Sequence, residues 1–272
     1  MNRRRYVLEI DKIYNMDCVE GMRLLPNDFV DCVITSPPYD GLRNYKGYIW
    51  DFNAVVHELY RVVKPGGVVV WVVGDETVKG SETGTSFRQA LGFMDVGFRL
   101  HDTMIYMKDN PPPVGGVNRY YQAFEYMFVF SKGSPRVFNP IMEPRRNKWN
   151  DKRTVRTRPV TRNKAGVFIK KEIPVNQGMV KLQNVWDYVV SGGSVAEEAY
   201  AHEHPAIFPE ALVRDHIISW TNPKDLVMDI FMGSGTTAKM AVKLDRHYLG
   251  FEISAEYCEL ACRRISDVKI DT

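Results

Sequence analysis

Six consecutive apolar residues, Val68 to Val73, follow the helix-breaking sequence Pro65-Gly66-Gly67. A strand without alternating polar positions is buried on both faces, which is typical of a parallel sheet covered by helices on both sides. Before the break, apolar residues recur at helical spacing from Asp51 to Val63, and this pattern predicts a helix. A helix, a glycine stop and a buried strand make up the repeating unit of a doubly wound α/β sheet.

The rest of the chain outside a central basic segment fits the same alternation. Strands are expected over residues 6–13, 30–34, 99–107, 124–130, 226–230 and 248–252. Helices are expected over residues 18–25, 87–98, 210–220 and 255–265, and from about residue 236. Residues 74–86 are expected to form a flexible loop, and the prolines and glycines of residues 109–117 exclude regular structure there.

A proline-rich loop, Ser36-Pro37-Pro38-Tyr39, follows the strand that ends near Thr35. Two prolines predict a rigid, exposed strand end, because proline fixes φ and lacks an N–H group. The Ser36 hydroxyl and the Pro37 carbonyl can accept the two N–H groups of a nucleobase amine, which localises its lone pair. Tyr39 can stack on that base once it has left the duplex. Taken alone, these residues suit a structural turn equally well, and the rest of the chain decides between the two.

A glycine loop, Phe231-Met232-Gly233-Ser234-Gly235, joins a buried strand to the helix that begins near Thr236. Glycine lets the backbone approach a ligand closely, and the N-terminus of a helix attracts anions. The loop alone also fits many nucleotide sites. Glu252 sharpens the prediction, because it ends the next strand and a carboxylate at that position can accept both hydroxyls of a ribose.

Taken together, Ser-Pro-Pro-Tyr at 36–39 and the sequence from Phe231 to Thr236 resemble the motifs of the DNA amino-methyltransferases. The catalytic tetrapeptide precedes the glycine loop, and this order resembles the β class of that family, a circular permutation. The resemblance implies a circularly permuted Rossmann-like α/β fold, a mostly parallel twisted sheet with helices on both faces. It also implies S-adenosylmethionine as the cofactor, with its methionine carboxylate at the glycine loop.

The resemblance further implies a target base and two cofactor contacts. Ser36 in the first position resembles the enzymes that methylate N4 of cytosine, whereas enzymes acting on N6 of adenine more often carry aspartate there; the adenine reaction is the alternative. Asp17 is expected to face the adenine amine of the cofactor, or to cap the following helix, and both can hold. His204 is expected near the methionine end. His202 and His204 have no third ligand in range, so no metal site is predicted.

The charge is segregated although the whole chain carries only +3. Residues 134–183 contain thirteen basic and three acidic side chains, a net charge of +10 that leaves −7 for the remainder. A solvated linker can carry such charge, but this segment also contains Trp149 and other apolar residues to bury. We therefore expect an inserted region that binds double-stranded DNA. The candidate contacts are Arg145, Arg146, Arg153, Arg156, Arg158 and Arg162, with Arg119 and Tyr120 in a preceding loop.

This pattern divides the chain into a catalytic half (1–133), the basic insertion (134–183) and a cofactor-binding half (184–272). None of the four cysteines lies in a Pro-Cys dipeptide, which argues against methylation at C5 of cytosine, a reaction that needs a thiolate. A protein or RNA amide methyltransferase and a non-catalytic DNA-binding module are the other classes considered. The first is expected to carry its glycine motif ahead of the Pro-Pro-Tyr loop, and the second has no need for both loops.

The expected setting is cytoplasmic and away from membranes. The longest apolar stretch is far shorter than the roughly 18 residues of a membrane span, and no apolar signal region follows Arg3, Arg4 and Arg5. A homodimer and a cognate restriction endonuclease are possible partners by resemblance to the β class.

Overall fold

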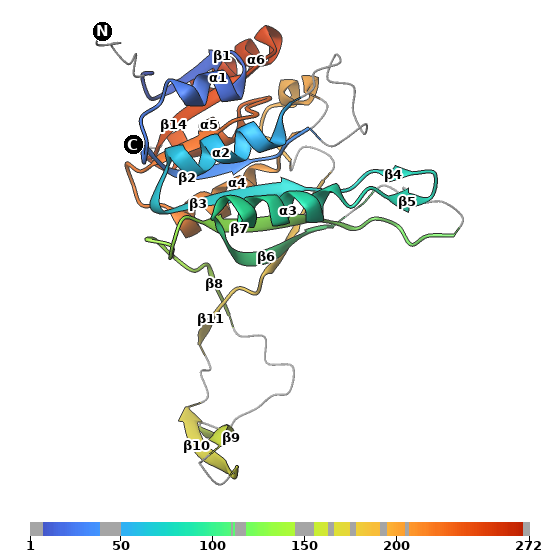
Figure 1. Cartoon of the computed structure of the whole chain (residues 1–272), viewed down its shortest axis with the longest axis vertical. Helices are drawn as coiled ribbons and strands as arrows, with labels where there is room; N and C mark the ends of the chain where they lie inside the picture. The colour runs from blue at the N-terminus through green and yellow to red at the C-terminus, as the bar shows by residue number, and fades with distance from the viewer. Residues whose placement is uncertain are drawn as a thin grey trace. The chain divides into compact units, whose positions relative to one another are not determined.

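A computed structural model of the chain describes residues 8–38, 50–109, 111, 118–144, 155–162, 166–174, 178–190, 195–204 and 207–268. The chain forms two compact units, one made of residues Pro140–Gln183 and the other of the remaining residues. The larger unit is built on an eight-stranded sheet with the order β1-β14-β13-β2-β3-β7-β6-β12 (Figure 1).

The strands of this sheet are β1 (Lys12–Asn15), β2 (Val30–Thr35), β3 (Val63–Val73), β6 (Arg99–Lys108), β7 (Phe124–Ser131), β12 (Val185–Tyr188), β13 (Leu226–Asp229) and β14 (His247–Glu252). Neighbouring strands run parallel except at β7, which is antiparallel to both β3 and β6. The sheet is therefore mostly parallel, as the continuous apolar runs predicted.

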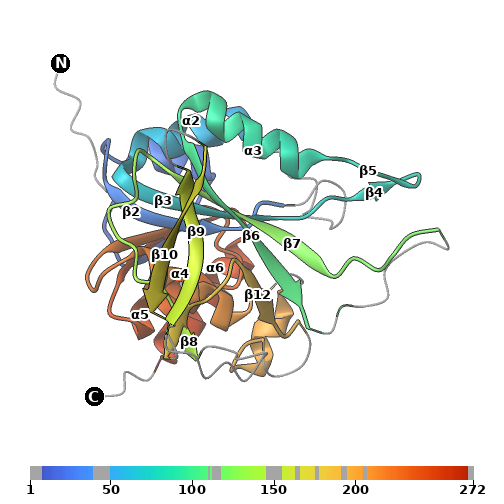
Figure 2. The ribbon, with the colours of Figure 1, turned by 90° about the horizontal axis from the view of Figure 1, so that it is seen from below.

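Two layers of helices cover the sheet. The helices are α1 (Cys18–Arg23), α2 (Phe52–Val62), α3 (Thr85–Val96), α4 (Glu210–Trp220), α5 (Thr236–Lys243) and α6 (Ala255–Ser266), with a short 3-10 helix η1 (Ala199–Glu203). The helices α1, α2 and α3 pack in sequence on one face, and α4, α5 and α6 on the other (Figure 2). This arrangement confirms the predicted three-layer α/β fold.

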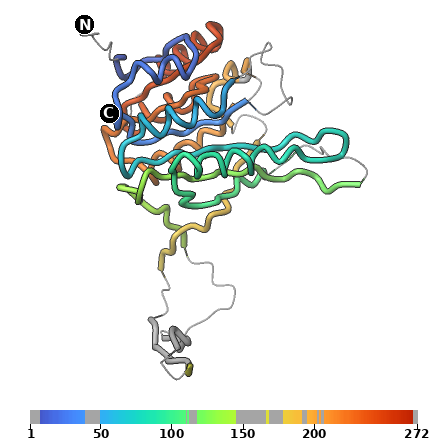
Figure 3. Tube along the Cα trace, in the orientation of Figure 1, coloured from blue at the N-terminus to red at the C-terminus, as the bar shows by residue number. Residues whose placement is uncertain are grey.

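The permuted order of the chain is visible in the sheet. The amino-terminal part of the larger unit, blue in Figure 3, lies beside the carboxyl-terminal part, orange to red. Strand β1 pairs with β14, and β2 pairs with β13. The two ends of the chain therefore build one continuous half of the sheet.

The core lies on both sides of the central strands. The predicted run from Val68 to Val73 is buried along its whole length. Trp71 is fully buried, and its Nε1 donates to Oε1 of Gln89 at 2.8 Å, so its one polar atom is satisfied. The rings of Phe93 and Phe130 stack with centroids 4.2 Å apart between α3 and β7. Burial on both faces fixes these strands in the centre of the fold.

Three local predictions differ from the structure. Strand β1 spans Lys12–Asn15, whereas a strand was expected over residues 6–13, of which residues 6 and 7 lie outside the described part of the chain. Strand β3 begins at Val63, because the chain passes from α2 directly into pairing with β2. The N–H of Gly66 donates to the carbonyl of Lys132, the residue after β7, and the N–H of Lys132 donates to Gly67. Residues 74–86 hold a short hairpin, β4 (Thr77–Val78) with β5 (Ser81–Glu82), where a flexible loop was expected. Most of the segment 109–117 lies outside the described residues.

The division between the units falls six residues later than the charge pattern suggested. The backbone N–H of Arg136 donates to Gly66 at 2.9 Å, and that of Asn139 donates to Ser219 at 2.9 Å. The guanidinium of Arg136 pairs with the buried carboxylate of Asp31 at 2.6 Å. Arg136 therefore neutralises a core acid of the larger unit and does not belong with the DNA-binding candidates.

The smaller unit contains two antiparallel strand pairs. Strand β8 (Met142–Pro144) pairs with β11 (Met179–Lys181), and β9 (Val155–Arg162) pairs with β10 (Phe168–Pro174). A β-bulge interrupts the second pair between Ile169 and Lys170. Among the residues described in either unit, no helix has both the length and the hydrophobicity that a membrane crossing requires.

Candidate active site

The candidate site lies where β2 and β13 end side by side. These parallel strands pair through Cys32 with Val227 and Val33 with Met228. The chain leaves β2 through α2 towards β3 on one side, and leaves β13 through α5 towards β14 on the other. A reversal of this kind opens a crevice at the carboxyl edge of the sheet, which is where open α/β folds bind ligands.

A cavity of about 630 Å³ occupies this crevice, a size typical of small-molecule sites. Ser36 and Pro38 line it from the end of β2. The segments after β13 and β14 supply most of the remaining wall. The lining residues outside the proline loop are Met16, Cys18, His204, Phe208, Asp229, Ile230, Phe231, Met232, Gly233, Ser234, Thr236, Phe251, Glu252, Ile253, Ser254, Ala255, Glu256 and Tyr257.

Both glycines of the loop are required by its geometry. Gly233 has φ +51° and Gly235 has φ +80°, a region that other residues rarely adopt. A Cβ atom at Gly233 would lie 2.9 Å from Nε2 of His204, and one at Gly235 would lie 2.6 Å from Cβ of Ala261. The first glycine therefore leaves room for the buried imidazole beside the cavity, and the second lets α5 pack against α6.

Glu252 ends β14, lines the cavity and contacts the glycine loop directly. Its Oε2 accepts a hydrogen bond from the N–H of Gly233 at 2.8 Å, and its Oε1 accepts one from the N–H of Ser254 at 2.8 Å. Burial raises the pKa of this carboxyl above its ordinary value, although these N–H groups favour the charged form. Each carboxylate oxygen keeps a further lone pair, so Glu252 can still accept ligand hydroxyls.

Asp229 is a site residue that the sequence reasoning missed. It is buried at the end of β13 and accepts hydrogen bonds from Thr35 Oγ1 at 2.6 Å, Thr237 Oγ1 at 2.7 Å and the N–H of Phe231 at 3.0 Å. Burial raises the pKa of Asp229 to about 6. Asp229 thus connects both loops and the first turn of α5. An acid at the end of a buried strand, just before a glycine loop, is the sequence signal that was available.

The predicted cofactor residues divide into those that line the cavity and those that do not. Phe231, Gly233, Ser234, Thr236, Glu252 and His204 line it. Gly235 does not line the cavity, but its positive φ sets the path of the loop backbone. Asp17 is not part of the lining; its Oδ1 accepts from the N–H of Val19 at 2.8 Å and of Glu20 at 3.1 Å, so the capping prediction is confirmed. The contact of Asp17 with adenine stays a prediction.

The proline loop is described as far as Pro38. Ser36 and Pro38 line the cavity, and Pro37 lies between them outside the lining. Tyr39 lies outside the described residues. The structure therefore brings the start of the proline loop and the glycine loop, nearly 200 residues apart in sequence, into one cavity.

The predicted DNA contacts are distributed over both units. Arg156, Arg158 and Arg162 lie on β9 of the smaller unit, whereas Arg145, Arg146 and Arg153 lie outside the described residues. In the larger unit, Tyr120 is 100% exposed. Nη1 of Arg119 donates to Thr77 at 3.2 Å and to Glu82 at 3.3 Å, so this arginine contacts both strands of the β4–β5 hairpin.

The described residues contain no group of three or more histidine, cysteine or acidic side chains arranged to hold a metal.

The fold and the cavity define a Rossmann-like methyltransferase with its strands in permuted order. The family model of the N6 and N4 methyltransferases, described as DNA methylase, matches residues 30–263. The chain therefore belongs to this family. It is a β-class DNA amino-methyltransferase. The orphan methyltransferase M.BamHII of Bacillus amyloliquefaciens is 51% identical over 239 residues, which cover 88% of this chain and 89% of that protein. The type II methyltransferase M.SmaI of Serratia marcescens is 27% identical over 297 residues, covering 93% and 90%.

Two solved structures share the fold. The cytosine-N4-specific PvuII DNA methyltransferase aligns with a TM-score of 0.67 at 23% identity, covering 98% of this chain and 90% of that one. The complex of M1.HpyAVI with S-adenosylmethionine aligns with a TM-score of 0.61 at 24% identity, covering 93% and 98%. At these identities the likeness concerns the fold.

Proposed function

We propose that the protein transfers a methyl group from S-adenosylmethionine to the exocyclic N4 of cytosine in double-stranded DNA, after the base has flipped out of the duplex. One observation carries this proposal: Ser36 and Pro38 line the same cavity as the glycine loop and Glu252. A methyl donor bound at the glycine loop and a base held at the proline loop would therefore meet inside one site.

The cavity fits the cofactor in three respects. Its volume of about 630 Å³ is sufficient for a nucleoside with an amino-acid tail. Glu252 keeps lone pairs for the ribose hydroxyls. The first turn of α5 offers backbone N–H groups to a carboxylate, because these groups have no acceptor within the helix. When bound, S-adenosylmethionine supplies an electrophilic methyl group on a cationic sulfur.

The proline loop would prepare the nucleophile. The Ser36 hydroxyl and the Pro37 carbonyl accept the two amine N–H groups, so the nitrogen lone pair is localised and aimed at the donor side of the cavity. Pro38 keeps the loop rigid, and Tyr39 stacks on the base. No strong general base is needed, because the methylated nitrogen is acidic and loses its proton readily.

The preference for cytosine over adenine rests on Ser36. The PvuII enzyme is named as specific for cytosine N4, but its 23% identity supports the fold and not the base. Methylation of adenine at N6 is the alternative within the same family. A homodimer and a cognate restriction endonuclease stay predictions of the family resemblance.

We propose that the smaller unit recognises DNA through the β9–β10 ribbon. In this ladder Arg158 is opposite Lys171 and Arg156 is opposite Ile173. The two strands carry five basic residues and one acid in their sequence, namely Arg156, Arg158, Arg162, Lys170 and Lys171 with Glu172. A two-stranded ribbon has the width of the major groove.

Nucleoside analysis tests the reaction. DNA from a host without other methyltransferases, in which this chain is expressed, is digested and its nucleosides are weighed by mass spectrometry. N4-methylcytosine is the expected product. N6-methyladenine alone would overturn the choice of base, and the absence of both products with an enzyme that binds S-adenosylhomocysteine would overturn the reaction itself.

A further inference from the structure

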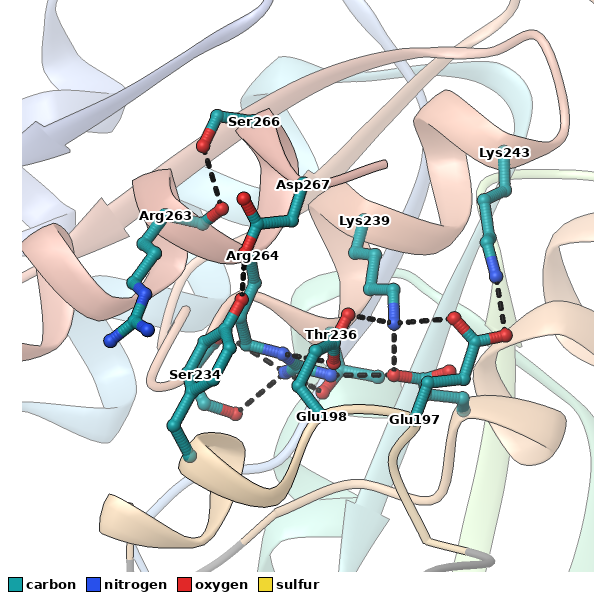
Figure 4. A network of polar contacts seen from close by, with 12 residues as sticks. Glu197, Glu198, Ser234, Thr236, Lys239, Lys243, Arg263, Arg264, Ser266 and Asp267 are labelled. Carbon is teal, nitrogen blue, oxygen red and sulfur yellow. Dashed lines mark hydrogen bonds and ion pairs between the residues drawn. The ribbon is translucent and has the colours of Figure 1, made fainter. Parts of the chain in front are cut away.

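A buried arginine on α6 contacts the glycine loop and the start of α5. Arg264 lies on α6 and is 0% exposed. Its Nη1 donates to the carbonyl oxygen of Ser234 at 2.9 Å and to Oγ1 of Thr236 at 2.9 Å, and it contacts Oγ of Ser234 at 3.1 Å (Figure 4). One nitrogen therefore holds the last loop residues and the first residue of α5 together.

The other nitrogens of the same guanidinium are anchored on two carboxylates. Nε donates to Oε2 of Glu198 at 3.2 Å, and Nη2 donates to Oε1 of Glu210 at 2.6 Å. Lys239 of α5, which is 1% exposed, reaches the same two acids at 2.5 and 2.7 Å (Figure 4). Glu198 precedes η1 and Glu210 opens α4. Because every guanidinium nitrogen is engaged, Arg264 has one well-defined position.

We propose that Arg264 is a positioning residue for the methionine carboxylate of the cofactor, an inference that rests on the proposed function. The hydrogen bond to Ser234 fixes the peptide plane between Ser234 and Gly235, whose N–H is bonded to Met232 at 2.9 Å. The bond to Thr236 fixes the start of α5. The N–H groups of the first helical turn are thereby held in the orientation that receives an anion.

Lysine cannot replace this arginine. Arginine has three nitrogens in a planar fork, whereas lysine has a single nitrogen on a flexible stem. Lysine at position 264 would keep the charge among Glu198 and Glu210 but lose the bridge to the carbonyl of Ser234. The Arg264→Lys variant therefore separates orientation of the turn from neutralisation of the buried acids.

The test compares two ligands on the full-length protein by isothermal titration calorimetry. S-adenosylhomocysteine carries the amino-acid tail, and 5′-methylthioadenosine carries the same adenosine and thioether without it. Arg264→Lys is expected to weaken binding of S-adenosylhomocysteine roughly tenfold, which is the loss for a misaligned hydrogen bond to an anion. Its affinity for 5′-methylthioadenosine is expected to equal that of the wild type. Lys243→Gln is the matched control, because Lys243 pairs with Glu197 at 2.6 Å without contacting the turn. It is expected to bind both ligands like the wild type.

Two results would overturn the inference: an equal loss for both ligands, or no loss for either. Glu198→Gln provides a milder variant in case Arg264→Lys does not fold. It weakens the Nε anchor and the contact of Glu198 with Lys239 but keeps the hydrogen bonds from Nη1 of Arg264 to Ser234 and Thr236, so it is expected to show a smaller loss confined to S-adenosylhomocysteine. Equal binding of S-adenosylhomocysteine by wild type and Glu198→Gln would then overturn the inference. A wild-type protein that binds neither ligand would contradict the proposed function instead.

Discussion

Thr35 Oγ1 donates a hydrogen bond of 2.6 Å to Oδ1 of Asp229, although 194 positions separate the two residues in the sequence. Each is the last residue of its strand, β2 and β13. Ser36 follows Thr35 directly, and the glycine loop begins shortly after Asp229. This one contact therefore fixes the proposed base-binding loop against the proposed cofactor loop.

Asp229→Asn is expected to flatten the dependence of stability on pH. The pKa of Asp229 rises from 3.8 when unfolded to about 6 when folded, so its stabilising contribution is present below 3.8 and is lost as the pH rises through 6. From pH 4.5 to 7.5 the wild type should lose about 2 kcal/mol relative to the variant, since a pKa unit corresponds to about 1.4 kcal/mol. Urea unfolding of both proteins across this range measures the difference, and parallel stability curves would contradict the prediction.

Gly235→Ala is expected to lower the melting temperature and abolish binding of S-adenosylhomocysteine. The new Cβ would meet both Cβ and Cα of Ala261 under 3 Å, and the backbone of α6 cannot yield cheaply. Gly80→Ala is the matched control, because Gly80 has φ +82° with nothing within 4 Å of the added atom. It should cost only about 1–2 kcal/mol from the left-handed backbone. Similar melting temperatures for the two variants would show that packing against α6 is unimportant.

Ser36→Ala is expected to reduce the single-turnover methylation rate while binding of S-adenosylhomocysteine stays at the wild-type level. The variant removes one acceptor for the amine of the target base, and loss of one such polar contact costs roughly 10²-fold in rate. Rapid-quench assays with labelled cofactor measure the rate, and calorimetry measures binding. An unchanged rate would exclude Ser36 from the chemical step.

The double variant Arg156→Ala and Arg158→Ala is expected to weaken DNA binding and to lower the salt dependence. Each lost phosphate contact should reduce the slope of log K against log salt by about 0.9. The double variant Lys224→Ala and Lys243→Ala removes the same charge from the larger unit, where these lysines pair with Asp245 and Glu197, and as the control it should change the slope less. Fluorescence anisotropy over a salt series measures both. Equal slopes for the two double variants would contradict recognition through the ribbon.

Periodicity and motif order were sufficient for the fold. The sheet and its helices could be predicted because each signal lies within a few neighbouring residues. These signals are the apolar run from Val68 to Val73, the strand before Phe231 and the acid that ends β14. The antiparallel direction of β7 could not be predicted, because a buried strand has the same apolar pattern in either direction.

Contacts between distant residues were beyond local patterns. Arg136 was counted among the basic residues of the insertion, but it pairs with Asp31, 105 positions earlier. In the sequence Arg264 is an ordinary cation in the last turn of a helix. Its partners are visible only once α6 has packed beside the glycine loop. The chemistry of a charged residue follows from its neighbours in space, and the sequence does not list them.

The pairing of β1 with β14 and of β2 with β13 also has a consequence for protein synthesis. Strand β2 leaves the ribosome with one edge still open, and β1 leaves it without its one partner in the sheet. The strands that pair with them, β13 and β14, are translated more than 190 residues later. Nascent chains halted before Leu226 should therefore present unpaired strand edges and bind chaperones, whereas release of residues up to Glu252 completes the sheet.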